Sequence, residues 1–260
     1  MKSQTLRLCL IAALSCASAA AMAENPFAGT WKIDYSKSHV TGQTISFTSE
    51  ADGKVRFTEP DGSYTFKPDG SNGTNDFNQT VQWKEMDAHT WKAFTKAGSM
   101  VVTETWTLGD GEKTLTVATS GTRPNGQQED ATETYTRVGP GKGFFGKWKS
   151  TKLANNTPTT RQFEANGDDG VIWNIPEIKA SVNLKFDGKD VAPTGPTVPN
   201  GLTLAATKAG PRSFELVEKM NGKVIFKARL TVSADGKTLT EVGAGVGSTV
   251  PERLVYNKAA

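Results

Sequence analysis

The feature that most constrains this chain is a short phrase that occurs twice. Phe-x-Gly-x-Trp-Lys is present at residues 27–32 and again at residues 144–149, 117 positions later. Each copy is followed by a segment of similar length in which matching pieces recur, and such self-similarity is the sign of an internal duplication. The 260 residues are therefore expected to form two related units rather than one.

Both units have the pattern of many short antiparallel strands. Asp-Gly and Asn-Gly pairs, which favour tight hairpin turns, separate runs rich in Thr, Val, Phe and Tyr. Along 100–108 and 224–232, alternate positions are mainly apolar on one face and polar on the other, so one face of each strand is predicted to be core. No stretch has a sustained helical period. We predict an all-β chain of two tandem antiparallel up-and-down β-barrels, since closure removes exposed strand edges.

The chain begins with the features of a secretory signal peptide at residues 1–23. Lys2 and Arg7 precede a short apolar run that ends in small residues, and the run is too short to span a bilayer. We expect export to the periplasm or the extracellular space, with acylation at Cys16 as an alternative. The remaining boundaries are predicted at 24–138 for the first barrel, 139–143 for a Gly/Pro linker, and 144–260 for the second barrel.

Charge and cysteine content narrow the possible functions. The net charge of +3 includes Lys2 and Arg7, and the chain without its signal has 28 basic and 27 acidic residues. These nearly equal numbers of basic and acidic residues argue against a nucleic-acid or anionic-membrane partner. Both cysteines, Cys9 and Cys16, lie in the signal, so no disulfide or thiolate site is expected afterwards. No later stretch is apolar enough for a transmembrane segment.

The Gly-x-Trp at the start of each unit resembles that of the lipocalin-like (calycin) barrels. The wider pattern, Asn-Pro-Phe-x-Gly-Thr-Trp-Lys with a late Ala-Asp-Gly-Lys-Thr-Leu-Thr, is similar to secreted lipocalin-like proteins of bacteria. In lipocalins the first-strand Trp lies at the closed end of the barrel, and a basic side chain from a late strand packs across it. The resemblance therefore implies that Trp31 contacts Arg137, and that Trp148 contacts Lys258 or Arg253.

No motif in the chain indicates catalysis. His39 and His89 stand in polar, turn-like surroundings, and no metalloprotease, serine-hydrolase or phosphate-loop pattern is present. We therefore predict no enzyme activity, no metal and no cofactor.

One strand position favours ligand binding instead. Glu104 lies on a core face between Val102 and Trp106, where the second unit has an alanine, and Glu241 takes the place of a valine in the neighbouring strand. A buried carboxylate is costly. Each is therefore either in an ion pair or near solvent, or it is a polar anchor inside a ligand cavity. The candidate ligand-binding residues are Val102, Glu104, Trp106, Phe226 and Glu241.

Two functions remain open at this stage. The first is an exported, non-enzymatic binding protein for a small apolar or amphipathic ligand held in a barrel. The alternative is a cell-envelope interaction module with solid barrels that binds another protein. Residues 189–201, rich in proline and glycine, are either an irregular connector or a lid over a barrel mouth.

Overall fold

The computed structural model describes residues 25–259 apart from residues 61, 156, 158 and 249. These residues form 19 strands and three single-turn 3-10 helices, and no α-helix occurs among them. The predicted all-β class is confirmed. Within the same described part of the chain, no helix has the length and apolar character needed to cross a membrane. The signal peptide predicted at residues 1–23 lies outside the described residues.

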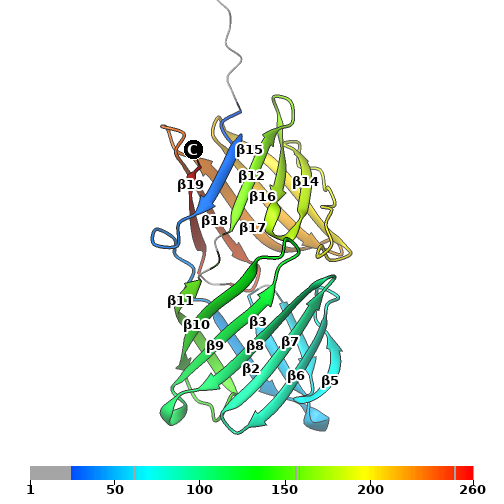
Figure 1. Cartoon of the computed structure of the whole chain (residues 1–260), viewed down its shortest axis with the longest axis vertical. Coiled ribbons are helices and arrows are strands. Elements are labelled where there is room, and N and C mark those ends of the chain that lie inside the picture. Colours follow the sequence, from blue (N-terminus) through cyan, green and yellow to red (C-terminus); the bar gives the residue numbers. More distant parts are fainter. Residues whose placement is uncertain (1–24, 61, 156, 158, 249, 260) are drawn as a thin grey trace, which may run out of the picture.

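The first barrel is a ten-stranded antiparallel sheet (Figure 1). Its hydrogen-bonded neighbours run in the order β4-β3-β2-β11-β10-β9-β8-β7-β6-β5, and the edge strands β4 and β5 contact each other, so the sheet is nearly closed. The strands of this ten-stranded barrel are β2 (Thr44–Ser49), β3 (Val55–Glu59), β4 (Gly62–Phe66), β5 (Asp69–Thr74), β6 (Thr80–Asp87), β7 (Thr90–Ala97), β8 (Met100–Leu108), β9 (Thr114–Thr122), β10 (Gln128–Val138) and β11 (Gly146–Asn155).

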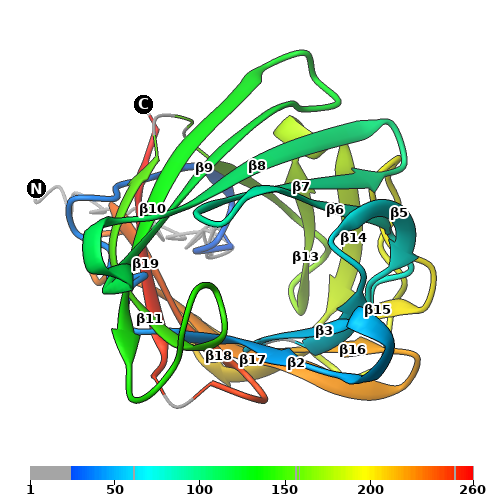
Figure 2. The ribbon, with the colours of Figure 1, turned by 90° about the horizontal axis from the view of Figure 1, so that it is seen from below.

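The second barrel is a nine-stranded antiparallel sheet in the order β14-β13-β12-β1-β19-β18-β17-β16-β15. A view along the long axis, in which the two barrels overlap, shows their strands arranged in a ring (Figure 2). The strands of this nine-stranded barrel are β1 (Gly29–Ile33), β12 (Thr160–Ala165), β13 (Gly170–Ile175), β14 (Ala180–Lys185), β15 (Leu202–Gly210), β16 (Ser213–Met220), β17 (Lys223–Val232), β18 (Thr238–Gly245) and β19 (Glu252–Lys258).

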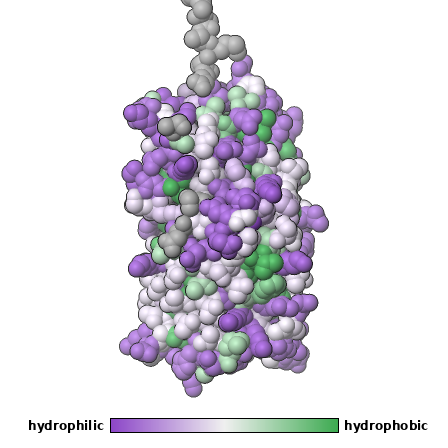
Figure 3. Space-filling view, viewed as in Figure 1, coloured by the Kyte–Doolittle hydropathy of each residue, from purple (hydrophilic) through white to green (hydrophobic). Residues whose placement is uncertain are grey.

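In most strands alternate side chains point into the barrel, while the others face solvent. On β17, for example, Ala228 and Leu230 are buried and Arg229 is exposed between them. Two separate hydrophobic cores result, one in each barrel. Polar residues cover much of the outer face, as the alternating sequence pattern predicts, although a hydrophobic patch is visible near the middle of the molecule (Figure 3).

The two barrels exchange their first strands. β1, the first strand of the N-terminal repeat, pairs with β12 and β19, while its equivalent β11 pairs with β2 and β10. The two strands pair in the same register. The phrase glycines Gly29 and Gly146 lie opposite Phe163 and Phe47, and Trp31 and Trp148 lie opposite Arg161 and Ile45. The boundaries 24–138 and 144–260 therefore follow the sequence repeats, but they need correction as barrel limits, since each barrel takes one strand from the other range.

The glycine-rich residues 139–143 are not a linker between barrels. They lie in the loop that joins β10 to β11, and these two strands pair with each other as a hairpin. Closing a short loop costs little entropy, so β11 stays beside β10. β1 then fills the equivalent place in the nine-stranded barrel. The chain crosses between the barrels in residues 34–43 and in the segment between β11 and β12.

The strand ends of the two barrels meet at a junction in the middle of the molecule (Figure 1). The Nε2 atom of Gln43 donates a hydrogen bond to the carbonyl of Val250 at 2.8 Å, and the amide of Gly247 donates to the carbonyl of Pro60 at 2.9 Å. Each of these bonds joins the two barrels. The junction therefore places the interiors of the barrels end to end.

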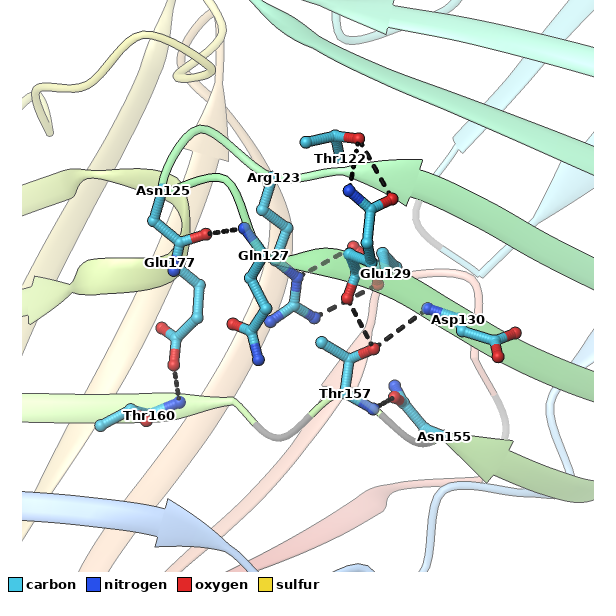
Figure 4. A network of polar contacts seen from close by, with 11 residues as sticks. Thr122, Arg123, Asn125, Gln127, Glu129, Asp130, Asn155, Thr157, Thr160 and Glu177 are labelled. Atoms are coloured by element: carbon cyan, nitrogen blue, oxygen red, sulfur yellow. Dashed lines mark hydrogen bonds and ion pairs between the residues drawn. The ribbon is translucent and has the colours of Figure 1, made fainter.

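A polar network holds the β9–β10 hairpin at the crossing into β12 (Figure 4). The hydroxyl of Thr157 accepts a hydrogen bond from the amide of Asp130 at 3.0 Å and donates to the carbonyl of Gln128 at 3.2 Å. Beside it, the Glu177 carboxylate accepts from the amide of Thr160 at 2.7 Å. These bonds satisfy backbone groups where the strand ladder is interrupted.

Each copy of the repeated phrase closes the outer end of a barrel. The indole Nε1 of Trp31 donates to the carbonyl of Phe27 at 2.8 Å, and Trp148 donates to the carbonyl of Phe144 at the same distance. Both tryptophans are fully buried. The carbonyl four residues earlier thus satisfies the one polar group of a buried indole.

A basic side chain lies across each of these tryptophans, but the pairing differs from the prediction. The Cζ atom of Arg137 is 4.0 Å from the ring centre of Trp148, and the Nζ atom of Lys258 is 5.3 Å from that of Trp31. The predicted pairs, Trp31 with Arg137 and Trp148 with Lys258 or Arg253, are therefore wrong. The reason is the strand exchange, which moves each tryptophan into the other barrel. Arg253 instead donates to the carbonyl of Lys37 at the junction.

The glycine of the phrase makes room for the basic side chain, which gives a first prediction. Gly146 has a φ of 121°, and an added Cβ would lie 3.1 Å from Nη1 of Arg137 and 3.0 Å from the carbonyl of Pro140. Gly146→Ala should lower the free energy of unfolding by about 2 kcal/mol in a urea titration. Gly126→Ala is the control, because Gly126 has a φ of 88° but open space around it. Equal losses for both variants would show that the basic side chain does not need this space.

Candidate functional site

The ten-stranded barrel contains a cavity of about 330 Å³. Aromatic side chains from β3, β4, β6, β8 and β10 form much of its wall, and three glutamates project from β3, β8 and β10. Lysine, arginine and histidine are absent from the described residues that line it. These aromatic residues and glutamates are Phe57, Tyr64, Trp83, Trp106, Tyr135, Glu59, Glu104 and Glu133.

Two of these glutamates are hydrogen-bonded to aromatic neighbours on their own strands. Oε2 of Glu104 accepts a hydrogen bond from Nε1 of Trp106 at 3.0 Å, and Oε2 of Glu133 accepts from the Tyr135 hydroxyl at 2.7 Å. The spacing of two residues keeps donor and acceptor on the same face of the strand. Each carboxylate is therefore held by a neighbour that also lines the cavity.

The surroundings of these carboxylates disfavour their charge. Burial raises the pKa of Glu104, and the nearby Glu133 raises it further, although the bond from Trp106 acts in the opposite direction. Burial likewise raises the pKa of Glu133, against the hydrogen bonds from Tyr135 and Ser150. Neither carboxylate has an ion-pair partner among the described residues. A positive charge inside the cavity would therefore stabilise both.

In the nine-stranded barrel a buried arginine, Arg161, occupies the position equivalent to Ile45 in the cavity lining of the ten-stranded barrel. Nη2 of Arg161 lies 2.9 Å from Oε2 of Glu241, and its Nε donates to the Tyr256 hydroxyl at 2.8 Å. The guanidinium also lies 4.6 Å from the ring centre of Trp173 and 5.2 Å from that of Tyr256. Burial lowers the pKa of Arg161, but the charge of Glu241, together with Tyr256 and Glu218, outweighs this and holds the pKa above its usual value. The pair occupies the interior, and the cavity beside it is smaller, about 210 Å³.

A third cavity, of about 310 Å³, lies at the junction between the barrels. It shares Glu59, Glu133 and Tyr135 with the cavity of the ten-stranded barrel and continues to Phe226 and Glu252 of the other barrel. The interior of the ten-stranded barrel therefore extends toward the junction rather than toward the tryptophan-closed end.

The five predicted ligand-binding residues do not form one site. Glu104 and Trp106 line the cavity of the ten-stranded barrel, while Val102 on the same strand is not part of its lining. Phe226 lines the junction cavity. Glu241 forms the ion pair with Arg161, which is the structural alternative stated for it above.

Sequence reasoning missed Glu133, Tyr135 and Arg161. Glu133 and Tyr135 belong to a strand whose alternate positions are mostly threonine, so the pattern did not indicate a buried face. Arg161 stands where the first repeat has Ile45, and its carboxylate partner is far away in sequence. Aligning the two repeats at β2 and β12 would have shown a cation that replaces a core residue.

The proline-rich residues 189–201 form part of the wall between β14 and β15. Val191 exchanges backbone hydrogen bonds with Leu204 on β15, and Thr194 does so with Ser181 on β14. Pro193 from this segment also lines the cavity of the nine-stranded barrel. The segment thus fills the gap between the edge strands, which favours the connector interpretation over a lid.

The other residues considered for catalysis lie apart from the cavity. His39 and His89 are exposed, and within the described part of the chain no three histidine, cysteine or acidic side chains cluster as a metal site. Asp34 and Lys37 form an ion pair with each other at 2.9 Å. Hydrogen bonds from Ser36, Lys37 and Asn257 hold the pKa of Asp34 well below its usual range.

The fold and its interior define a tandem antiparallel β-barrel protein whose repeats exchange their first strands. Comparisons with known protein families, with curated proteins and with solved structures found no match to this chain. The function is therefore inferred from the barrels and their cavities.

Proposed function

We propose that this protein is a non-enzymatic binding protein that holds one small amphipathic molecule inside the ten-stranded barrel. The single observation that carries the proposal is the cavity of about 330 Å³, whose wall combines aromatic rings with three glutamates and the polar side chains of Asn75, Gln79, Thr95 and Thr119. Sites for small molecules are typically concave, 300–1,000 Å³ in volume, and mainly apolar with a small number of placed polar groups. The volume of this cavity lies at the lower end of that range, and its wall is more polar than that of a typical site, which favours an amphipathic ligand over a purely apolar one.

The nine-stranded barrel supports a different role for the second repeat. At the position equivalent to the proposed site its interior holds the Arg161–Glu241 pair and a smaller cavity, so this position is not a second equivalent site. The alternative function, a cell-envelope module that binds another protein, rests on the exposed Val242 and Val246 at the surface of this barrel. The unfilled cavity favours ligand binding over this alternative.

The finer assignment to lipocalin-like exported proteins belongs to the same proposal. The repeated Trp with a basic side chain across it is the arrangement that the resemblance implies, although the partners are exchanged. Export rests on the sequence pattern at residues 1–23.

A neutral aromatic probe tests the proposal. We expect 1-aminoanthracene to bind the chain without its signal peptide with one equivalent per molecule, measured by the rise of its fluorescence in a titration. Thr119 lines the cavity, so Thr119→Phe should fill it and weaken binding at least tenfold.

The neighbouring Ala118 provides a matched control. It is exposed on the same strand, so Ala118→Phe places the same ring on the outer face and should leave binding unchanged. Two results would count against a cavity site: no binding to the unmodified protein, or equal binding by the two phenylalanine variants.

A further inference from the structure

The two barrels can be compared position by position, because their registers match. Ile45 lies opposite Trp148 as Arg161 lies opposite Trp31, so Ile45 and Arg161 are equivalent. Tyr135 is likewise equivalent to Tyr256, since they face Leu115 and Leu239 in corresponding pairs of strands. The same reasoning makes Phe57 equivalent to Trp173.

In the nine-stranded barrel the chain itself supplies a cation to this position. The Arg161 guanidinium contacts a carboxylate, a tyrosine hydroxyl and two aromatic rings. Such contacts stabilise a desolvated cation through charge pairing and through the negative face of the rings. The filled barrel therefore shows what an interior of this kind can hold.

The ten-stranded barrel keeps the rings, lacks the cation, and has its carboxylates at different positions, since Val117 replaces Glu241. Ile45 replaces the arginine, whereas Glu104 and Glu133 stand where the other barrel has Ala228 and Leu254. The cavity lining of this barrel thus has three carboxylates and, among the described lining residues, no basic side chain. Its cavity at this position, about 330 Å³, is larger than the one beside Arg161, about 210 Å³, although a separate hollow of about 620 Å³ lies at the outer end of the nine-stranded barrel around Phe27 and Phe186.

We propose that the ten-stranded barrel binds an organic cation: a small molecule with an ammonium or guanidinium group and an apolar part. The cationic group lies near Glu104 and Glu133, and the apolar part packs on the aromatic wall. The inference rests on the proposed function and names its ligand class. A bare metal ion fits less well, because divalent cations prefer a shell of oxygen ligands, and in the described part of the chain no three acidic, histidine or cysteine side chains come together to hold one.

A matched series of three probes tests the ligand class. 1-Naphthylmethylamine, 1-naphthylmethanol and 1-naphthoate share one ring system and differ in charge. At about pH 8, where an alkylamine is still protonated, we expect the amine to bind at least tenfold more tightly than the alcohol, and the carboxylate more weakly than either. Isothermal titration calorimetry on the chain without its signal peptide gives the three dissociation constants.

Two variants locate the preference in the cavity. Glu104→Gln and Glu133→Gln should each reduce the amine-over-alcohol ratio at least threefold while the alcohol still binds. Glu85→Gln is the control, because Glu85 is exposed on β6 of the same barrel and should leave the ratio unchanged. An unchanged ratio in both cavity variants would overturn the inference.

A third variant supplies the cation from the chain. Ile45→Arg places a guanidinium where the other barrel has Arg161, so it should compete with the amine and weaken its binding at least tenfold. Unchanged amine affinity in this variant would contradict the proposed position of the cation. Equal binding of amine and alcohol by the unmodified protein overturns the ligand class alone, whereas binding of none of the three probes contradicts the proposed function as well.

Discussion

Replacing Arg161 by isoleucine, the residue at the equivalent position 45, should destabilise the nine-stranded barrel by about 3–5 kcal/mol. The substitution leaves the Glu241 carboxylate buried without its cation, and an unpaired buried charge costs far more than the pair contributes. Glu241→Val should have an effect in the same direction, because it removes the carboxylate that pairs directly with the buried guanidinium. Urea unfolding measures the loss, and native-state hydrogen exchange at β12 and β18 places it in this barrel.

The double variant is the critical control. Arg161→Ile with Glu241→Val reproduces the apolar pair Ile45 and Val117 of the other barrel, so most of the stability should return. A deficit of about 1 kcal/mol is expected to remain, since the stacking of the guanidinium on aromatic rings is lost as well. A double variant as unstable as the single ones would show that burial of an unpaired charge is not the cause.

Much of the architecture could be predicted because local sequence patterns specify it. Alternating apolar residues and Asp-Gly turns specify antiparallel hairpins, and the duplicated phrase specifies two units. Glu104 and Trp106 were placed correctly on a core face that proves to line a cavity. Each of these features depends on residues that are near one another in sequence.

The strand exchange could not be predicted from the same patterns. β1 and β11 carry the same phrase and adopt the same register, so either strand is compatible with either barrel. What decides the partner is the short hairpin loop after β10, which keeps β11 beside it. The Arg161–Glu241 pair was missed for a related reason, because neither residue on its own indicates its distant partner.

The exchange makes an unusual prediction for the two closing tryptophans. Trp31 belongs to the first repeat, yet it is fully buried in the nine-stranded barrel between β12 and β19. Trp31→Ala should therefore destabilise that barrel by about 3–5 kcal/mol, the usual cost of removing a large buried aromatic side chain. Hydrogen exchange should become faster in β12 and β19 while β2 and β10 stay protected.

Trp148→Ala is the matched variant, and the strands in which hydrogen exchange becomes faster should be those that Trp31→Ala leaves protected. Trp148 lies opposite Ile45 on β2 and Arg137 on β10, so its loss should expose those two strands and spare β12 and β19. If each repeat instead kept its own first strand, Trp31→Ala would affect β2 and Trp148→Ala would affect β12. Hydrogen exchange in the two variants therefore distinguishes the two arrangements. With exchanged strands β12 responds to Trp31→Ala and β2 to Trp148→Ala, whereas without exchange the responses are reversed.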